Sequence, residues 1–319
     1  MQTTHVIGAI LVVLFLILAP YILTPYLTYL LTWILLWCIF AMAYNLCFGL
    51  GGMLSFCHGV FFGLGGFGVA WSISAGLNPW FALLIGISLA TISSLLIGFI
   101  SLKTRKTQFA ILTLIITTIA YDVSLRFTNI TGGVDGITFS IPKLVLGNLV
   151  LPLSSPAVRW YTVSISFLIS FYIYYRIFNS PFGLVLKAIK TNEERCRFIG
   201  YDTTRLLLMA FVASGFLSGI CGSIFSLIYG FACATYFEAS TSIYGILWTY
   251  VGGLGTLLGP IVGCSLLVPL TDYLSAYFRR YWIVIGALLI VCIYKFPKGI
   301  IGYLIPRLLT RKTLEVIRK

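Results

Sequence analysis

Long apolar runs follow one another along the chain, separated by short stretches rich in glycine, proline or charged residues. A helix of about 20 apolar residues can cross a bilayer, and the runs and their breaks predict ten candidate spans. They lie at 6–23, 26–48, 59–75, 80–102, 109–125, 160–178, 206–229, 243–258, 260–277 and 281–294. The third, eighth and tenth are short and fit re-entrant or tilted pieces as well as full crossings. The pattern therefore predicts about eight to ten transmembrane helices.

The composition excludes a soluble fold. Of the 319 residues, 60% are hydrophobic and 9% are charged, and the mean hydropathy is +1.03, whereas a soluble domain is roughly a quarter charged. The first charged residue is Lys103, which excludes a soluble N-terminal domain, and the first five residues lack the basic region of a cleaved signal peptide. We predict an all-α, polytopic integral membrane protein with a single transmembrane domain over 1–319.

The net charge of +13 does not indicate nucleic-acid binding, because the basic residues form short clusters between apolar runs. With ten alternating spans, sixteen Lys and Arg residues fall on one side of the membrane and five on the other. Basic loops face the cytoplasm, so both termini and the segment 180–205 are predicted to be cytoplasmic. The loop 127–159 is then predicted to face outward, and membrane lipid is the expected surrounding.

The residues needed for catalysis or metal binding are not combined in any recognisable motif. The chain has two histidines, His5 and His58, and eight cysteines without a CxxC pair, which we interpret as free, small hydrophobic residues. It contains no GxxxxGK[ST] phosphate loop, no HExxH, no Ser/His/Asp set and no paired-carboxylate motif. We therefore predict no enzyme activity, no ATP hydrolysis by this chain, no metal site and no bound cofactor.

A glycine-rich segment covers 49–68 and contains His58 and a formal GxGxxG pattern at Gly63, Gly65 and Gly68. No strand–turn–helix context surrounds this pattern, so it does not indicate a dinucleotide site. Such glycines permit close packing of membrane helices, or a backbone break beside a water-filled path. His58 is either a packing residue hydrogen-bonded to a neighbouring carbonyl or an imidazole lining a polar translocation path. Both alternatives stay open.

Ionisable residues within apolar spans need a reason to be there. Asp122 precedes Arg126 by four residues, which predicts an ion pair on one helical face at the outer membrane edge. Asp272 lies close to the outer boundary and is expected to be solvated. The chain has no succession of buried acids typical of a proton relay, which disfavours an ion-driven transporter.

A polar, highly charged stretch between two spans covers 180–205. Ser180 and Pro181 suit a helix cap and first turn, and Gly200 is expected to end the helix. Apolar and basic positions alternate in an amphipathic pattern between these ends. The pattern predicts a short amphipathic cytoplasmic helix, and it leaves open whether this helix docks on a partner protein or faces solvent and lipid headgroups.

Five stretches in order resemble one family. They are LSFCHGVFFGLGGFGVA, FAILTLIITTIAYDVSLRFTNITGGVDGI, SPFGLVLKAIKTNEERCRFIGYD, VGGLGTLLGPIVG and FPKGIIGYL. Together they are similar to the inner-membrane permeases of branched-chain amino-acid type ABC importers, in the branch related to the "M" permease of that system. The resemblance covers about 41–304.

This resemblance implies an ATP-driven importer for branched-chain or other hydrophobic amino acids in the bacterial inner membrane. It implies four kinds of contact for this chain: a second, homologous permease subunit, two cytoplasmic ATPases that use the ATP, an external or periplasmic solute-binding protein, and lipid. Relatives that carry urea or short amides leave the solute open. A self-sufficient facilitator or channel is the alternative class.

The resemblance also implies roles for particular residues. Coupling to the ATPases falls on Lys187, Glu193, Glu194 and Gly200. The translocation path or helix packing falls on the glycines named above and on Gly252, Gly253, Gly255 and Gly259. The TGG-x-DG loop, consisting of Thr131, Gly132, Gly133, Asp135 and Gly136, lies where a delivering protein could touch it. A capped outer turn stabilised by Asp135 is the alternative for that loop.

Overall fold

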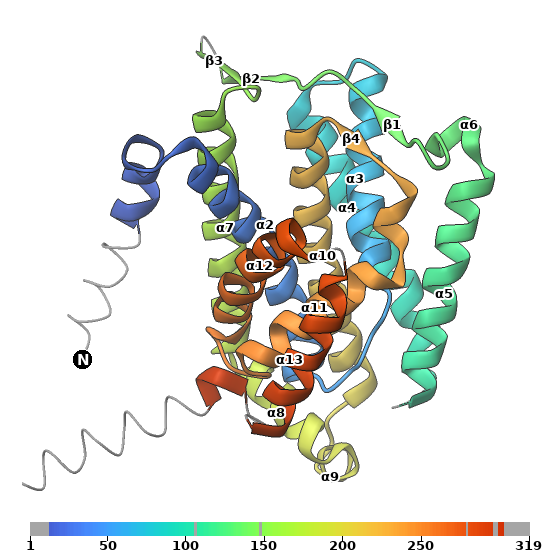
Figure 1. Ribbon diagram of the computed structural model, residues 1–319. Helices are drawn as coiled ribbons and strands as arrows, with labels where there is room; N and C mark the ends of the chain where they lie inside the picture. The colour runs from blue at the N-terminus through green and yellow to red at the C-terminus, as the bar shows by residue number, and fades with distance from the viewer. Residues whose placement is uncertain (1–12, 105–106, 147–148, 279, 296–298, 303–319) are drawn as a thin grey trace, which may run out of the picture.

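The computed structural model describes residues 13–104, 107–146, 149–278, 280–295 and 299–302 (Figure 1). Helices make up most of this described part, as the apolar pattern predicts. The longer elements are α2 (Pro25–Tyr44), η1 (Asn45–Leu50), α3 (His58–Ser74), α4 (Pro79–Ser101), α5 (Thr107–Arg126), α7 (Pro156–Phe178), α10 (Thr203–Tyr229), α11 (Ala239–Gly252), α12 (Gly259–Tyr277) and α13 (Tyr281–Lys295). Both chain termini, predicted to be cytoplasmic, lie outside the described residues.

Five helices in the described part are long and apolar enough to cross a membrane: Pro25–Leu50, Pro79–Ser101, Thr107–Arg126, Pro156–Phe178 and Thr203–Tyr229. The three spans predicted to be short are short: α3 has 17 residues, α11 has 14 and α13 has 15. The described part of the first predicted span is a shorter apolar helix, Val13–Ile22. The chain is an all-α, multi-pass membrane protein.

The helices begin where the sequence supplies a cap and a proline. Thr24 accepts a hydrogen bond from the backbone N–H of Leu27 at the start of α2, and Asn78 accepts one from Trp80 at the start of α4. A proline occupies the first turn in both, where a missing backbone N–H does no harm. These local signals place the ends of the spans.

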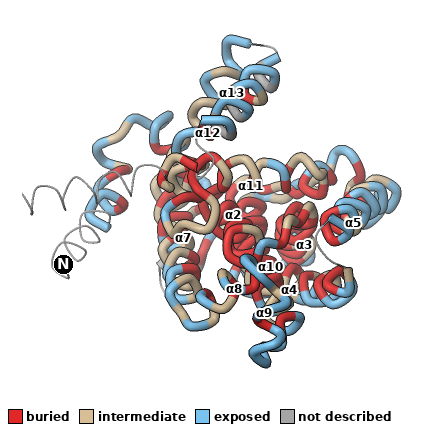
Figure 2. The backbone as a smooth tube through the Cα atoms, turned by 90° about the horizontal axis from the view of Figure 1, so that it is seen from below, coloured by how far each residue is buried: buried red, intermediate tan, exposed pale blue. Residues whose placement is uncertain are grey.

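Helices α3, α4 and α10 form the centre of the bundle, where they approach closely along small residues. A Cβ on Gly65 would lie 2.6 Å from the carbonyl oxygen of Gly219, and a Cβ on Gly86 would lie 2.5 Å from that of Gly65. Figure 2 shows α2, α3 and α10 as largely buried, whereas α4 buries only the face that packs on α3 and α10. Glycine lets the backbones meet without intervening side chains.

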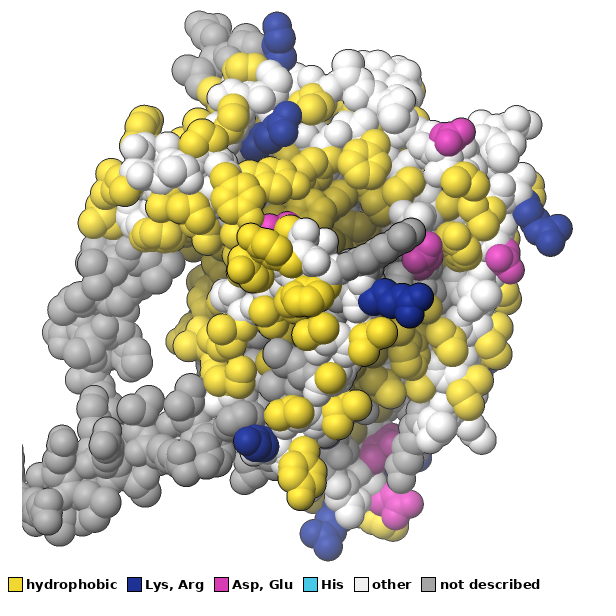
Figure 3. All heavy atoms as spheres, in the orientation of Figure 1, with side chains coloured by type: hydrophobic (Ala, Val, Ile, Leu, Met, Phe, Trp, Pro, Cys, Tyr) yellow, Lys and Arg dark blue, Asp and Glu magenta, His cyan; other side chains and the backbone are white. Residues whose placement is uncertain are grey.

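Aromatic rings fill the space between α2 and this centre. The ring of Trp37 stacks on Phe62 at 5.5 Å and lies 5.1 Å from the ring of Trp248. Phe225 of α10 lies 5.4 Å from Phe62. Apolar side chains also cover much of the face in Figure 3, as expected for contact with lipid, and charged side chains of both signs lie at both its upper and its lower end.

The loop 127–159 contains short elements at the end of the molecule opposite α8 (Pro181–Thr191) and α9 (Glu193–Phe198) (Figure 1). They are α6 (Thr128–Thr131), β1 (Ile137–Thr138), β2 (Lys143–Leu146) and β3 (Leu149–Pro152). β2 and β3 form an antiparallel hairpin, and β1 pairs antiparallel with β4 (Phe231–Ala232), directly after α10. The pairing of β1 with β4 fastens this loop to the central helix α10.

Two expectations about cysteines and acids can be compared with the structure. The seven cysteines whose side chains it describes are free, and six of them are buried, as interpreted. The ion pair predicted between Asp122 and Arg126 is not formed, although both lie on α5 within the described residues. Both side chains are exposed, where solvation competes with a weak surface pair.

Candidate functional site

The segment 180–205 is two helices rather than the single helix predicted. They are α8 (Pro181–Thr191) and α9 (Glu193–Phe198), separated at Asn192. The backbone of Asn192 is extended, and its side chain accepts a hydrogen bond from the N–H of Arg195 at 3.0 Å. Asn is a strong helix N-cap, so it starts a new helix here. Gly200, with a φ of 97°, lies just past the end of α9, where a residue in the left-handed region is favourable.

Glu193 holds this segment together internally. Its Oε1 accepts hydrogen bonds from Nη2 of Arg197 at 3.2 Å and from Oγ1 of Thr203 at 3.0 Å. Thr203 is the first residue of α10, so the carboxylate joins α9 to the central helix. The neighbouring Glu194 is exposed.

The outermost part of the segment is apolar. Phe198 is 89% exposed and Ile199 is 76% exposed, at the turn between α9 and α10. Large apolar side chains exposed outside the membrane-spanning helices are typical of a protein contact. We refer to Phe198 and Ile199 as the apolar tip.

Two lysines of α8 contact other parts of the chain; Lys187 is half-buried and Lys190 remains partly exposed. Nζ of Lys187 lies 3.8 Å from the centroid of the Phe178 ring. Nζ of Lys190 donates a hydrogen bond to the carbonyl oxygen of Gly49 at 2.9 Å. Burial lowers the pKa of both lysines below the usual lysine value. Lys190 thereby connects the segment to η1, the last turn and a half of the span that begins as α2.

Asn45, the first residue of the π-helical η1, is fully buried and makes hydrogen bonds to two other parts of the chain. Its Nδ2 donates to the hydroxyl of Tyr174 on α7 and to the carbonyl oxygen of Thr256 at 2.9 Å. Its Oδ1 accepts from the backbone N–H of Gly255 at 2.9 Å. One amide thus joins η1, α7 and the turn between α11 and α12.

Four of the glycines predicted for the path or for helix packing, Gly252, Gly253, Gly255 and Gly259, lie at this junction. A Cβ on Gly49 would lie 1.8 Å from Oδ1 of Asn45, and one on Gly252 would lie 1.8 Å from the carbonyl oxygen of Gly259. Gly253 and Gly255 have φ values of 131° and 71°, so they form a turn. Gly255 and Gly259 do not share a helix, because α11 ends at Gly252 and α12 begins at Gly259.

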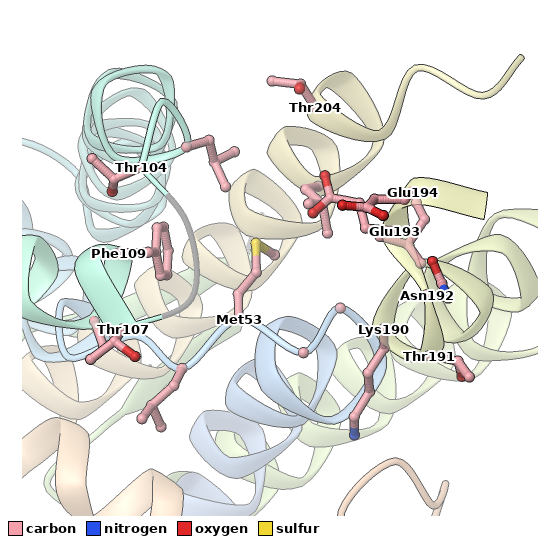
Figure 4. A pocket seen from close by; sticks show the side chains of 17 residues that line it. Met53, Thr104, Thr107, Phe109, Lys190, Thr191, Asn192, Glu193, Glu194 and Thr204 are labelled. Atoms are coloured by element: carbon pink, nitrogen blue, oxygen red, sulfur yellow. The ribbon is translucent and has the colours of Figure 1, made fainter. Parts of the chain in front are cut away.

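A cavity of about 830 Å³ lies beside the segment, between the α8–α9 break and the loop that joins α4 to α5 (Figure 4). Its walls come from the loop after η1, the start of α5 and the α8–α9 break, and its labelled side chains include Met53, Phe109, Asn192, Glu193 and Glu194. Glu193 and Glu194 lie close together on one wall, whereas the amine of Lys190 points away from them toward η1. The cavity separates the segment from the neighbouring helices on this side.

His58 is fully buried at the start of α3. Its Nε2 lies 3.2 Å from Oγ of Ser214, and its ring lies 4.9 Å from that of Tyr44 and 5.8 Å from that of Phe61. The expected carbonyl partner is replaced by a hydroxyl, and Nδ1 has no hydrogen-bond partner among the described residues. A Cβ on Gly63 would lie 2.6 Å from the ring of Phe237.

The TGG-x-DG loop is stabilised by Thr131 rather than by Asp135. Oγ1 of Thr131 donates to the carbonyl oxygen of Phe127 at 2.9 Å and accepts from the N–H of Gly133 at 3.2 Å. Gly132, Gly133 and Gly136 have φ values of 73°, 61° and 70°. Asp135 is exposed, and no hydrogen bond of its carboxylate is found within the described part of the chain.

Together these features define a class: an integral-membrane helical protein in which a charged helical segment at one end is hydrogen-bonded to a glycine-rich break between its spans. Residues 26–293 match the family model described as "Branched-chain amino acid transport system / permease component". The chain belongs to this family, as the five sequence stretches indicate.

The chain is similar to named members from bacteria and archaea. It is 26% identical over 292 residues to the high-affinity branched-chain amino acid transport system permease protein LivM of Salmonella typhimurium. The aligned region covers 85% of this chain and 68% of that protein. It is 26% identical over 284 residues to the probable LivM permease of Methanocaldococcus jannaschii, covering 79% and 81%. It is 22% identical over 287 residues to LivH of Salmonella typhimurium, covering 83% and 90%. No solved structure matches the chain.

Two residues of this site were not singled out from the sequence. Lys190 was read only as part of the amphipathic pattern, and Asn45 lies within the predicted span 26–48. A signal for Asn45 was present, because a lone amide in an apolar run, four residues before a glycine, needs a partner in the membrane. No sequence signal distinguishes Lys190 from Lys187.

Proposed function

We propose that this chain is a membrane-spanning permease subunit of an ATP-driven importer in the bacterial inner membrane, carrying branched-chain or other hydrophobic amino acids. The family match carries the transport role. The link from the apolar tip through Lys190 to the glycine junction supports coupling to an ATPase. Permeases for urea or short amides are the alternative within the family.

The proposed coupling runs through described contacts. An ATPase that grips the apolar tip pulls on α9, which Glu193 and Arg197 fasten to Thr203 at the start of α10 and which follows α8 directly at Asn192. Lys190 transmits that movement to the carbonyl of Gly49. Asn45 passes it to Gly255 and Thr256, between α11 and α12. A ligand or partner shifts such an element only by its differential affinity for the two positions.

The proposed assembly has three further kinds of subunit. Relatives named LivM and LivH carry the name of the same transport system, which supports a pair of homologous permeases. ATP is used by two cytoplasmic ATPases, and this chain binds no cofactor of its own. The exposed Asp135 and Val134, at the end opposite the tip, are available to a solute-binding protein.

Replacing both tip residues, Phe198→Ser with Ile199→Ser, tests the ATPase contact. We expect capture of the ATPase and ATP-driven leucine uptake to fall at least about tenfold, because buried aromatic anchors dominate interface energies. Pull-down of the ATPase and uptake into vesicles measure the two effects.

The control is Val134→Ser, an apolar side chain that is 79% exposed at the other end of the molecule. It should leave ATPase capture unchanged. Equal capture by the tip variant and this control would rule out the proposed dock. Full-speed uptake by the purified chain alone, without any ATPase, would instead establish a facilitator.

Introduced cysteines test the orientation. In intact cells, a membrane-impermeant maleimide should label Val134→Cys, and it should label Phe198→Cys only after the membrane is opened, because basic loops face the cytoplasm. Both sites are largely exposed, whereas six of the seven described native cysteines are buried. The reverse labelling pattern would invert the topology.

A further inference from the structure

A second hollow lies between α2, α11 and α12, away from the coupling segment. It has a volume of about 270 Å³ and is lined mainly by aromatic side chains. The ring centroid of Trp33, one of the lining residues, lies 5.5 Å from that of Tyr229, the last residue of α10. Shortly after Tyr229 comes β4, which pairs with β1 of the loop 127–159. The hollow therefore lies in the half of the bundle nearer the loop 127–159, which is the outer half in the predicted topology. An apolar hollow with an acidic side chain at its margin is visible on this face in Figure 3.

The walls of the hollow are rings at helical spacing. Tyr29, Trp33 and Trp37 follow one face of α2, and Tyr244 and Trp248 follow one face of α11. Neighbouring rings support one another: the Trp37 and Trp248 centroids are 5.1 Å apart and those of Tyr244 and Trp248 are 5.7 Å apart. Such rings offer both an apolar surface and the negative face that attracts cations.

The third wall, from α12, brings one carboxylate. Asp272 is exposed, as the sequence suggested, and its Oδ2 also accepts a hydrogen bond from the hydroxyl of Tyr26 at 2.6 Å, which orients the carboxylate. Thr271 and Ser275, which flank it in the lining, donate their hydroxyl protons to backbone carbonyls of α12. Asp272 is the only charged group among the ten lining residues. An ionisable side chain in a membrane helix that faces a cavity typically marks a solute path.

We propose that this hollow binds the protonated amino group and the apolar side chain of the transported solute, with Asp272 as the counter-ion and the rings as the apolar wall. The proposal rests on the permease function proposed above. A volume slightly below that of drug-sized sites suits a solute with few heavy atoms. Because the described residues of the lining include no Lys, Arg or His, the hollow recognises the ammonium and apolar ends of an amino acid and not its carboxylate.

The test uses the permease complex purified in lipid nanodiscs and follows tryptophan fluorescence, since three tryptophans line the hollow. Leucinol, which keeps the ammonium and the isobutyl group of leucine, should quench saturably. 4-Methylpentanoate, which keeps the apolar part and a carboxylate but lacks the amine, should not compete. Asp272→Asn should weaken leucinol binding at least about tenfold, as expected for loss of a charge-assisted hydrogen bond, and Asp272→Glu should retain most of it.

Asp122→Asn is the matched control, because Asp122 is an exposed acid on α5 and does not line the hollow. It should bind leucinol like the unaltered complex. The proposal is overturned by absence of saturable leucinol binding, by equal binding in Asp272→Asn, or by loss of the second permease from the Asp272→Asn complex, which would assign the hollow to a subunit contact. Failure of leucine uptake by a complex that binds leucinol would count against the proposed function alone.

Discussion

Replacing Gly222 with alanine is expected to destabilise the protein more than any other single-methyl change in its centre. A Cβ at this position would lie 1.9 Å from the carbonyl oxygen of Phe62 and 2.7 Å from its carbonyl carbon. These are backbone atoms of α3, so α3 and α10 would have to separate. We expect a loss of about 3 kcal/mol or more, at the upper end of overpacking costs, measured as the unfolding midpoint in detergent.

Gly286→Ala provides the matched control on α13. Among the described residues, nothing lies within 4 Å of the position its Cβ would take, and alanine favours a helix over glycine by up to about 1 kcal/mol. Its midpoint should be unchanged or higher. If Gly222→Ala unfolds at the same point as this control, the close contact between α3 and α10 is not present in the membrane protein.

Lys190→Met is expected to uncouple ATP hydrolysis from transport. The substitution keeps the approximate length of the side chain but removes the donor to the carbonyl of Gly49. A hydrogen bond to a charged group contributes about 1.5–3 kcal/mol, and the partly buried carbonyl would lose this bond. We expect ATPase capture to persist while solute moved per ATP hydrolysed falls by about tenfold. Proteoliposomes with both rates measured in one preparation give this ratio.

Lys187→Met separates loss of a lysine from loss of this contact. Lys187 lies on the same helix and packs on Phe178 without reaching η1. It should couple nearly normally, and Lys190→Arg should recover part of the ratio, because it restores a cationic donor. Equal uncoupling by Lys187→Met and Lys190→Met would attribute the effect to α8 in general.

Most of the helical framework could be predicted from apolar run lengths, and the short α3, α11 and α13 were anticipated. The boundaries were wrong where backbone conformation decides them. The predicted span 243–258 continued past the end of α11, because Leu254, Leu257 and Leu258 kept the run apolar while Gly253 turned the chain. Hydropathy does not record a positive φ.

The break in the coupling segment could have been predicted. Asn192 followed by Glu193 and Glu194 is a helix-start signal, an N-cap with acids in the first turn. The amphipathic pattern on either side hid it. The proposed role of Glu193 is also changed by this geometry, because its carboxylate braces the turn while Phe198 and Ile199 present the outer surface.

The junction itself could not be predicted from one sequence. Asn45 contacts Gly255 and Thr256, more than 200 positions along the chain, and Lys190 contacts Gly49 across 141 positions. Helix and turn propensities depend on residues close together in the sequence, so they do not predict contacts over such separations. Only the packing of α2 against α7 and α12 brings them together.

The π-helical turn Asn45–Leu50 has a geometric consequence for the span it ends. A π turn holds one residue more than an α turn, and each α-helical residue advances the azimuth by about 100°. The extra residue therefore sets the angle about the helix axis between the ring face at Tyr29, Trp33 and Trp37 and the carbonyl of Gly49. If that residue were absent, one end of the span would point about a quarter-turn away from its present neighbours while the other stayed in place.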